Sequence, residues 1–335
     1  MKVLVSFISS RNKEDFQGTR LRKSIKGSLE LSGIKHTSSH IDYYDVTHFI
    51  SVKDENKINE SLENNDKVVV SCLGTEGDKT TSYLDVKIDK KGKKIISLLP
   101  KTLKILNKVH LILVPNEISK QFLKKEGVTT KIGIVPVGVN LSRFDFSRED
   151  EKEIFYRYYR EDKTKKLIVA TGHYDSLSGI SAYIAAAKKN PDAIFYYFAP
   201  DTKKLSFKTR HLIKNAPKNL KFKSIPSDDI YRSALINASL YVYTGYGVLG
   251  VVNLLEAMAA RCQIIIREQP MFEDIFKDQD NVYVYKYSET LTSFIKDFLE
   301  EKVESTIENA YKYVQTVTID KVGELLKNSY ESLLK

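Results

Sequence analysis

At 335 residues, with 42% hydrophobic and 29% charged residues, the chain is long enough for two globular domains, and its composition excludes an intrinsically disordered protein. The net charge of +10 indicates an anionic partner such as a nucleic acid, a nucleotide or an anionic membrane surface, without choosing among them. No apolar run approaches the roughly 20 residues of a membrane-spanning helix. We interpret the apolar start as a buried strand rather than a signal peptide. Cys72 and Cys262 lack metal-type spacing and are expected to be reduced thiols in a cytoplasmic protein.

Short apolar runs alternate with amphipathic stretches along most of the chain. The runs predict strands at 2–8, 46–50, 67–73, 110–115 and 131–136, and in a second set at 165–172, 193–199, 219–225, 239–245, 263–268 and 282–285. Helical patterns lie between most of them, for example at 178–189 and 249–260. Near-continuous apolar strands separated by helices favour parallel sheets that are covered on both faces.

A charged stretch separates the two sets of strands, with an interdomain linker near residues 140–165. The sequence therefore predicts an α/β fold of two doubly wound, Rossmann-like domains, at 1–145 and 146–300. Residues 301–335 have a helical pattern and are expected to pack back on the N-terminal domain. Since ligands of open parallel sheets bind beyond the carboxyl ends of the strands, the loops after strands are the places to look for a site.

The segment "YGVLGVVNLLEAMAA" (246–260) follows one of these strands and predicts a helix that begins near Gly250. Free N–H groups at a helix start favour phosphates, and a glutamate further along, Glu256, is able to accept hydrogen bonds from sugar hydroxyls. The alternative is purely structural, with Glu256 complementing the helix dipole and Asn253 facing solvent. Local sequence leaves both interpretations open.

Two further segments have the same order of strand and glycine turn. In "IVPVGVNLSRFDFS" (134–147) the turn is at Gly138 and is followed by an Arg143–Asp145 charge pair. The alternative is that this segment is a plain interdomain linker. In "VATGHYDSLSGISAYIAAAKKN" (169–190), His173 lies just past the strand end, where it meets either a phosphate or solvent.

Together these segments resemble the family 4 retaining glycosyltransferases, which have the GT-B fold of two facing Rossmann-like domains. The likeness is carried by "LVPNEISKQFLKKEG", "VPVGVNLSRFDFS", "VATGHYDSLSGISAYIAAAKK", "IPSDDIYRSALINASLYVYTG" and "LGVVNLLEAMAARCQIIIREQPMFEDIF", which cover most of residues 105–285. Within the family the sequence is most similar to Gram-positive enzymes that add a sugar to a glycosyl-diacylglycerol.

The resemblance implies a nucleotide-sugar donor of the UDP type, with no metal and no further cofactor. Glu256 matches the glutamate that holds the donor ribose. The implied donor-binding residues are Gly250, Val251, Asn253, Glu256, His173 and, near the nucleobase, Ile225. The implied acceptor-side and cleft residues are Gly18 and Arg20, in a loop after the first strand, and Gly138.

The donor site also departs from the family pattern. The first glutamate of the motif is replaced by Val248, and an arginine and a lysine that neutralise the diphosphate are replaced by His173 and Ser178. Cations and a helix N-terminus stabilise the charge of the leaving phosphate in such enzymes, at about 3–4 kcal/mol for a single donor. These losses raise the alternative of a catalytically degenerate GT-B protein that acts as a non-catalytic partner of another glycosyltransferase.

The segment 87–110 joins a lysine cluster to apolar residues. A basic amphipathic segment is able to lie on an anionic bilayer, so Lys93, Lys94, Lys101 and Lys104 are candidate membrane contacts on the inner face of the plasma membrane. The alternative is a core-packing helix with a solvated lysine face, interrupted by Pro100.

The leading interpretation is a metal-independent, retaining glycosyltransferase that moves a hexose from a nucleotide sugar to a glycolipid or glycan acceptor. Nucleic-acid binding rests on net charge alone, because the sequence has no basic-aromatic stacking platform, and it is not expected.

Overall fold

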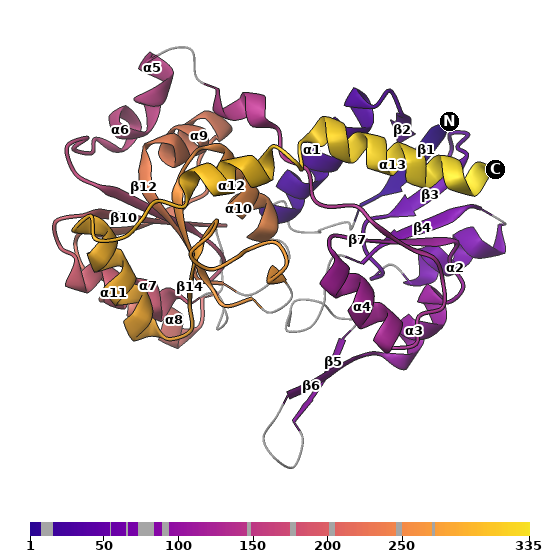
Figure 1. Cartoon of the computed structure of the whole chain (residues 1–335), viewed down its shortest axis with the longest axis horizontal. Coiled ribbons are helices and arrows are strands. Elements are labelled where there is room, and N and C mark those ends of the chain that lie inside the picture. The colour runs from indigo at the N-terminus through magenta and orange to yellow at the C-terminus, as the bar shows by residue number, and fades with distance from the viewer. Residues whose placement is uncertain are drawn as a thin grey trace.

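The computed structural model describes residues 1–7, 16–53, 55–64, 66–72, 84–88, 94–145, 149–174, 179–200, 205–245, 250–269 and 272–335. Two six-stranded sheets, parallel throughout, form two lobes side by side (Figure 1). The first sheet has the order β2-β1-β3-β4-β7-β8, and the second has the order β11-β10-β9-β12-β13-β14. A separate antiparallel hairpin, β5-β6, projects from the first lobe (Figure 1).

The strands of the first lobe are β1 (Lys2–Ser6), β2 (Lys35–Thr37), β3 (Val46–Phe49), β4 (Val68–Ser71), β5 (Leu84–Ile88), β6 (Lys94–Leu98), β7 (Leu111–Val114) and β8 (Ile132–Ile134). Those of the second lobe are β9 (Leu167–Thr171), β10 (Ile194–Ala199), β11 (Leu220–Ser224), β12 (Ala238–Tyr243), β13 (Gln263–Arg267) and β14 (Tyr283–Tyr285). All eleven predicted strands are confirmed. Three strands were not predicted: the short edge strand β2 and the two strands of the hairpin.

The helices are α1 (Phe16–Leu31), α2 (Glu55–Glu63), α3 (Pro100–Leu106), α4 (Glu117–Lys125), the 3-10 helix η1 (Leu141–Phe144), α5 (Glu149–Lys152), α6 (Ile154–Tyr159), α7 (Ile180–Lys189), α8 (Phe207–Lys214), α9 (Asp228–Asn237), α10 (Gly250–Ala259), α11 (Ser288–Leu299), α12 (Ile307–Val314) and α13 (Ile319–Leu334). Among the described residues, no helix is both long and apolar enough to cross a bilayer.

The order of the strands predicts where each sheet has a ligand-binding crevice. In the first sheet the order reverses between β1 and β3, and in the second between β9 and β12. Such a switch point opens a crevice beyond the carboxyl ends of the strands. Helix α1 follows β1 and helix α10 follows β12, so each of the two helices begins at the switch point of its own sheet.

The hydrophobic core is continuous from one lobe to the other. One cluster runs from Val3 on β1 through the linker residues Val137 and Val139 to α10. Helix α1 packs directly against α10 and, more extensively, against α13. The two lobes therefore share a core along α1, the linker and the C-terminal helices.

The two helices after residue 300 pack on different lobes: α12 packs on α10 of the second lobe, and α13 packs on α1 of the first. Both termini lie at the outer end of the first lobe (Figure 1). The domain boundaries after residues 145 and 300 stay a prediction.

A buried polar contact ties α13 to the first sheet. His48 on β3 lies 2.7 Å from the Tyr330 hydroxyl through Nδ1 and 2.8 Å from Ser71 Oγ through Nε2. Because all three side chains are buried, the imidazole exchanges its water contacts for these two hydrogen bonds. Burial lowers the pKa of His48 to about 3, so the ring is neutral in the folded protein at ordinary pH.

Candidate donor site at the start of helix α10

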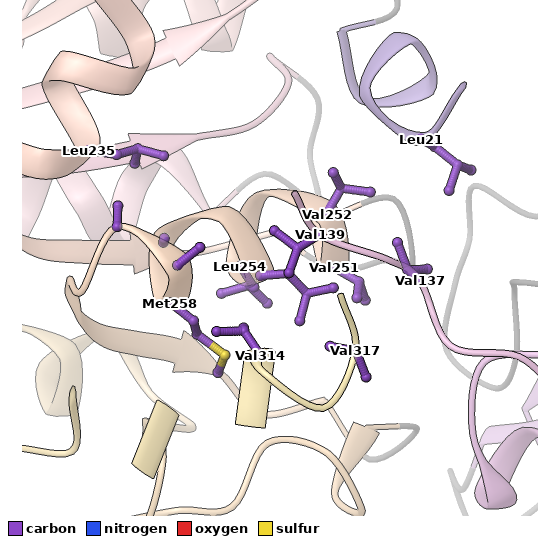
Figure 2. Packing of buried hydrophobic residues seen from close by; sticks show 14 of the residues in the cluster. Leu21, Val137, Val139, Leu235, Val251, Val252, Leu254, Met258, Val314 and Val317 are labelled. Atoms are coloured by element: carbon purple, nitrogen blue, oxygen red, sulfur yellow. The ribbon is translucent and has the colours of Figure 1, made fainter. Parts of the chain in front are cut away.

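Helix α10 is the most deeply buried helix of the second lobe, and its sequence explains why. Valine, leucine, alanine and methionine occupy seven of its ten positions in "GVVNLLEAMA", and a helix that is apolar almost all round belongs in a core. Figure 2 shows Val251 and Leu254 gathered with Val314 and Val317 around Val139 of the linker. The helix begins at Gly250, as predicted.

Asn253 faces the second sheet, so the solvent-facing alternative for this residue is wrong. Its side chain is fully buried, and Nδ2 donates to Thr171 Oγ1 at 3.0 Å, where β9 ends. The Thr171 hydroxyl also lies 2.5 Å from that of Tyr241. Asn253 Oδ1 is buried without a hydrogen-bond partner in the described structure.

Glu256 is 2% exposed and lies where α1, α10 and η1 meet. Its Oε1 accepts from Arg20 Nη1 at 2.5 Å and from Arg143 Nη1 at 2.7 Å. The second nitrogens of the same arginines reach Asp228 Oδ1, at 3.3 Å from Arg20 and 2.6 Å from Arg143. We call Arg20, Arg143, Asp228 and Glu256 the interdomain ion cluster, because Arg20 comes from the first lobe, Arg143 from the linker and the two acids from the second lobe.

The formal charges of the interdomain ion cluster sum to zero. Burial alone would raise the pKa of the Asp228 carboxyl, but Arg143, Arg20 and Lys23 outweigh burial and hold that pKa below its ordinary value. Arg20 is 5% exposed, and its guanidinium lies 4.1 Å from the centre of the Tyr231 ring, a cation–π contact. Arg20 and Glu256 are the buried pair of this cluster, and removing one partner of a buried ion pair costs about 3–5 kcal/mol.

His173 and Ile225 lie at the carboxyl edge of the second sheet, as expected. His173 is two residues past β9, and its backbone carbonyl accepts from the Tyr197 hydroxyl at 3.0 Å. Ile225 directly follows β11 and packs partly buried against the core. Val248 and Ser178, where the family pattern is broken, lie outside the described residues.

The acceptor-side residues are placed differently from the prediction. Gly18 was expected in a loop, but α1 begins at Phe16, so Gly18 is helical and Arg20 stands on the next turn. Gly138 was expected to line the cleft. It is instead buried between α1 and α13, where its carbonyl accepts from Ser24 Oγ at 2.7 Å and an added Cβ would lie 3.2 Å from Ile319.

Sequence reasoning missed the partners of Arg143. It suggested a local pair with Asp145, whereas the structure pairs Arg143 with Asp228 and Glu256, which are 85 and 113 residues away. It also missed a second contact between the lobes, in which Asn116 Nδ2 donates to Asp274 Oδ1 at 2.9 Å. No local sequence signal identifies either pair, because the pairing arises only when the two sheets are placed side by side.

The predicted membrane segment is not one continuous element. Strand β6 ends at Leu98, Leu99 is extended, and Pro100 opens α3, as expected because proline excludes the residue before it from the helix. Lys94 therefore lies on the hairpin, while Lys101, paired with Glu55 at 3.1 Å, and the exposed Lys104 lie on α3. Lys93 lies outside the described residues.

The described His, Cys, Asp and Glu side chains form no group that is able to hold a metal ion.

The paired sheets, with a helix starting at each switch point, define the GT-B fold, and solved structures support this. The chain aligns over 100% of its length with 98% of a glycosyltransferase from Rickettsia africae, at a TM-score of 0.73 and 13% identity. It aligns over 99% of its length with 99% of HepE from Anabaena in complex with UDP, at a TM-score of 0.73 and 12% identity. At such identities the likeness establishes the fold alone.

Two sequence comparisons find glycosyltransferase relatives. Residues 85–137 match the family described as "Glucosyltransferase 3-like, N-terminal domain". The processive diacylglycerol alpha-glucosyltransferase of Acholeplasma laidlawii is 25% identical over 317 residues, covering 92% of each chain. The resemblance to family 4 glycosyltransferases is thereby confirmed, and it includes the likeness to enzymes that glycosylate diacylglycerol lipids.

Proposed function

We propose that the protein is a glycosyltransferase that moves a hexose from a UDP-type nucleotide sugar to a glycolipid or glycan acceptor, with retention of configuration and without a metal. The observation that carries the proposal is the placement of α10, whose N-terminus opens at the switch point of the second sheet. The relative from Acholeplasma laidlawii supports a glucosyl donor and a diacylglycerol lipid acceptor. HepE, solved with UDP and with UDP-glucose, supports a uridine nucleotide.

In this proposal the diphosphate lies at the first turn of α10, where free backbone N–H groups and the helix dipole favour an anion. The ribose lies further along the helix, at Glu256, and the nucleobase lies near Ile225. The interdomain ion cluster is neutral as a whole, so its arginines do not replace the two cations missing from the family pattern. Stabilisation of the leaving phosphate then falls mainly to the helix start and to His173.

The membrane side of the proposal rests on the hairpin and α3 rather than on a single helix. The lipid acceptor of the relative requires an enzyme that works at a bilayer surface, and Lys94, Lys101 and Lys104 come from neighbouring elements of the first lobe. Flotation with anionic and neutral liposomes tests this part. Binding that is absent, or indifferent to lipid charge, contradicts it.

The test of the function is transfer from a panel of nucleotide sugars to a diacylglycerol glycolipid, with the anomeric configuration of the product read by NMR. We expect turnover with a UDP-hexose, retention, and no loss of rate in EDTA. Nucleotide binding without turnover on any acceptor would instead favour the non-catalytic alternative. No turnover together with no nucleotide-induced thermal shift would refute the proposal.

A further inference from the structure

The two carboxylate oxygens of Glu256 have different surroundings. Oε1 accepts from both arginines, at 2.5 and 2.7 Å, whereas Oε2 is shielded from solvent and has no hydrogen-bond partner in the described structure. Burying an acceptor without a donor costs free energy, and the cost is larger when the acceptor is charged. Oε2 is therefore left without a donor by the residues that the structure describes.

A second acceptor without a partner lies on the same face of α10. Asn253 stands three residues before Glu256, so the two side chains are neighbours on the helix surface. The Asn253 amide is oriented by its bond to Thr171, and Oδ1 has no hydrogen-bond partner. Two buried acceptors side by side at the switch point of the second sheet match a ligand that offers two adjacent donors, as a vicinal diol does.

The arginines determine which carboxylate oxygen of Glu256 lacks a hydrogen-bond donor. Each guanidinium uses one nitrogen on Glu256 and the other on Asp228, a forked contact that a lysine ammonium does not reproduce. Arg20 is further held by the face of Tyr231, and Arg143 by its carbonyl, which accepts from Arg232 Nε at 2.5 Å. The carboxylate is therefore restrained from both sides through Oε1.

We propose that Arg20 and Arg143 are positioning residues that orient Glu256, so that Oε2 and Asn253 Oδ1 accept hydrogen bonds from the ribose diol of the nucleotide. This inference rests on the proposed function. Because Arg20 belongs to the first lobe and Glu256 to the second, the ion pair that orients the carboxylate requires both lobes. The first lobe thus contributes to nucleotide recognition through an ion pair, without touching the nucleotide.

The test compares the affinities of UDP and 2′-deoxy-UDP for the full chain by isothermal titration calorimetry. A hydrogen bond to a charged acceptor contributes about 1.5–3 kcal/mol, so wild type is expected to prefer UDP by about 10- to 100-fold. Arg20→Met is expected to lose most of that preference and to raise the donor KM more than it lowers kcat. Arg22→Met is the matched control, since Arg22 is exposed on the same helix and lies over the Phe7 ring, and it is expected to keep the preference.

A merely structural role for the arginine would weaken both nucleotides equally and leave their ratio unchanged. An unchanged ratio in Arg20→Met, or tighter UDP binding because Glu256 is released, overturns the proposal. If Arg20→Met does not fold, Arg143→Lys serves in its place, because it keeps the charge and loses the fork, and a reduced ratio is again expected. Wild-type UDP binding without preference for ribose overturns this proposal and leaves the proposed function standing, whereas no nucleotide binding at all overturns both.

Discussion

Stability at mildly acidic pH should depend strongly on one buried histidine. The pKa of His48, which burial lowers to about 3, lies well below the ordinary value of 6.5, so the unfolded chain binds a proton that the folded chain excludes. The folded state therefore keeps its full stability above pH 6.5 and loses about 1.4 kcal/mol per pH unit between 6.5 and 3. From pH 7 to pH 5 the His48 contribution amounts to about 2 kcal/mol.

Urea unfolding of wild type and His48→Gln at pH 7, 6 and 5 measures this contribution, because other titrating groups cancel in the difference between the two proteins. The difference in unfolding free energy should shrink by about 2 kcal/mol on going to pH 5. Tyr330→Phe is the control: it removes a hydrogen bond worth about 1 kcal/mol and leaves the histidine in place, so its pH dependence should follow wild type. Parallel pH profiles for wild type and His48→Gln would refute the reasoning.

Three other predictions concern packing. Gly323→Ala places a Cβ 2.2 Å from a backbone oxygen of α1, so it should lower the unfolding free energy by about 1–3 kcal/mol. The control Leu325→Ala, at an exposed position of the same helix, should change the unfolding free energy by less than about 0.5 kcal/mol, and equal losses of melting temperature in the two variants would contradict the close contact. Phe155→Ala empties a fully buried position in an aromatic cluster and should lower the unfolding free energy by about 3–5 kcal/mol in urea, and a loss under 1 kcal/mol would mean that the ring is not in the core. Burial raises the pKa of the Cys72 thiol to about 12 and also raises that of Cys262, so neither should react with Ellman's reagent at pH 8 until the chain unfolds; fast labelling of the native protein would show that a thiol is exposed.

The sheets were predictable from sequence because their strands are buried on both faces. "LIVAT" of β9 and "IFYYFA" of β10 are almost wholly apolar, and such short runs between helical patterns are typical of buried parallel strands. The edge strand β2, "KHT", has no apolar run to reveal it. The hairpin was mistaken for part of an amphipathic segment because two lysines are followed by two isoleucines in "KKIISL", a short pattern that fits helical and strand periods alike.

The candidate site was predictable only in part. The start of α10 at Gly250 and the importance of Glu256 follow from the local sequence and the family resemblance. The partners of Glu256 do not, since Arg20 lies 236 residues away and Arg143 lies 113 residues away. Arg20 was noted as a cleft residue, but its contact with Glu256 depends on two switch points facing each other, which no single segment encodes.

The most direct test of the central claim, that a nucleotide sugar binds along α10, is donor kinetics of wild type and Glu256→Gln with UDP-glucose and a diacylglycerol glycolipid. Loss of the charged acceptor should raise the donor KM by about tenfold or more, while Glu308→Gln, at an exposed acid of the same lobe, should match wild type. Turnover by wild type with this pattern is the predicted result. A Glu256→Gln enzyme with unchanged donor KM, or a wild type that neither transfers glucose nor binds any nucleotide, would contradict the account.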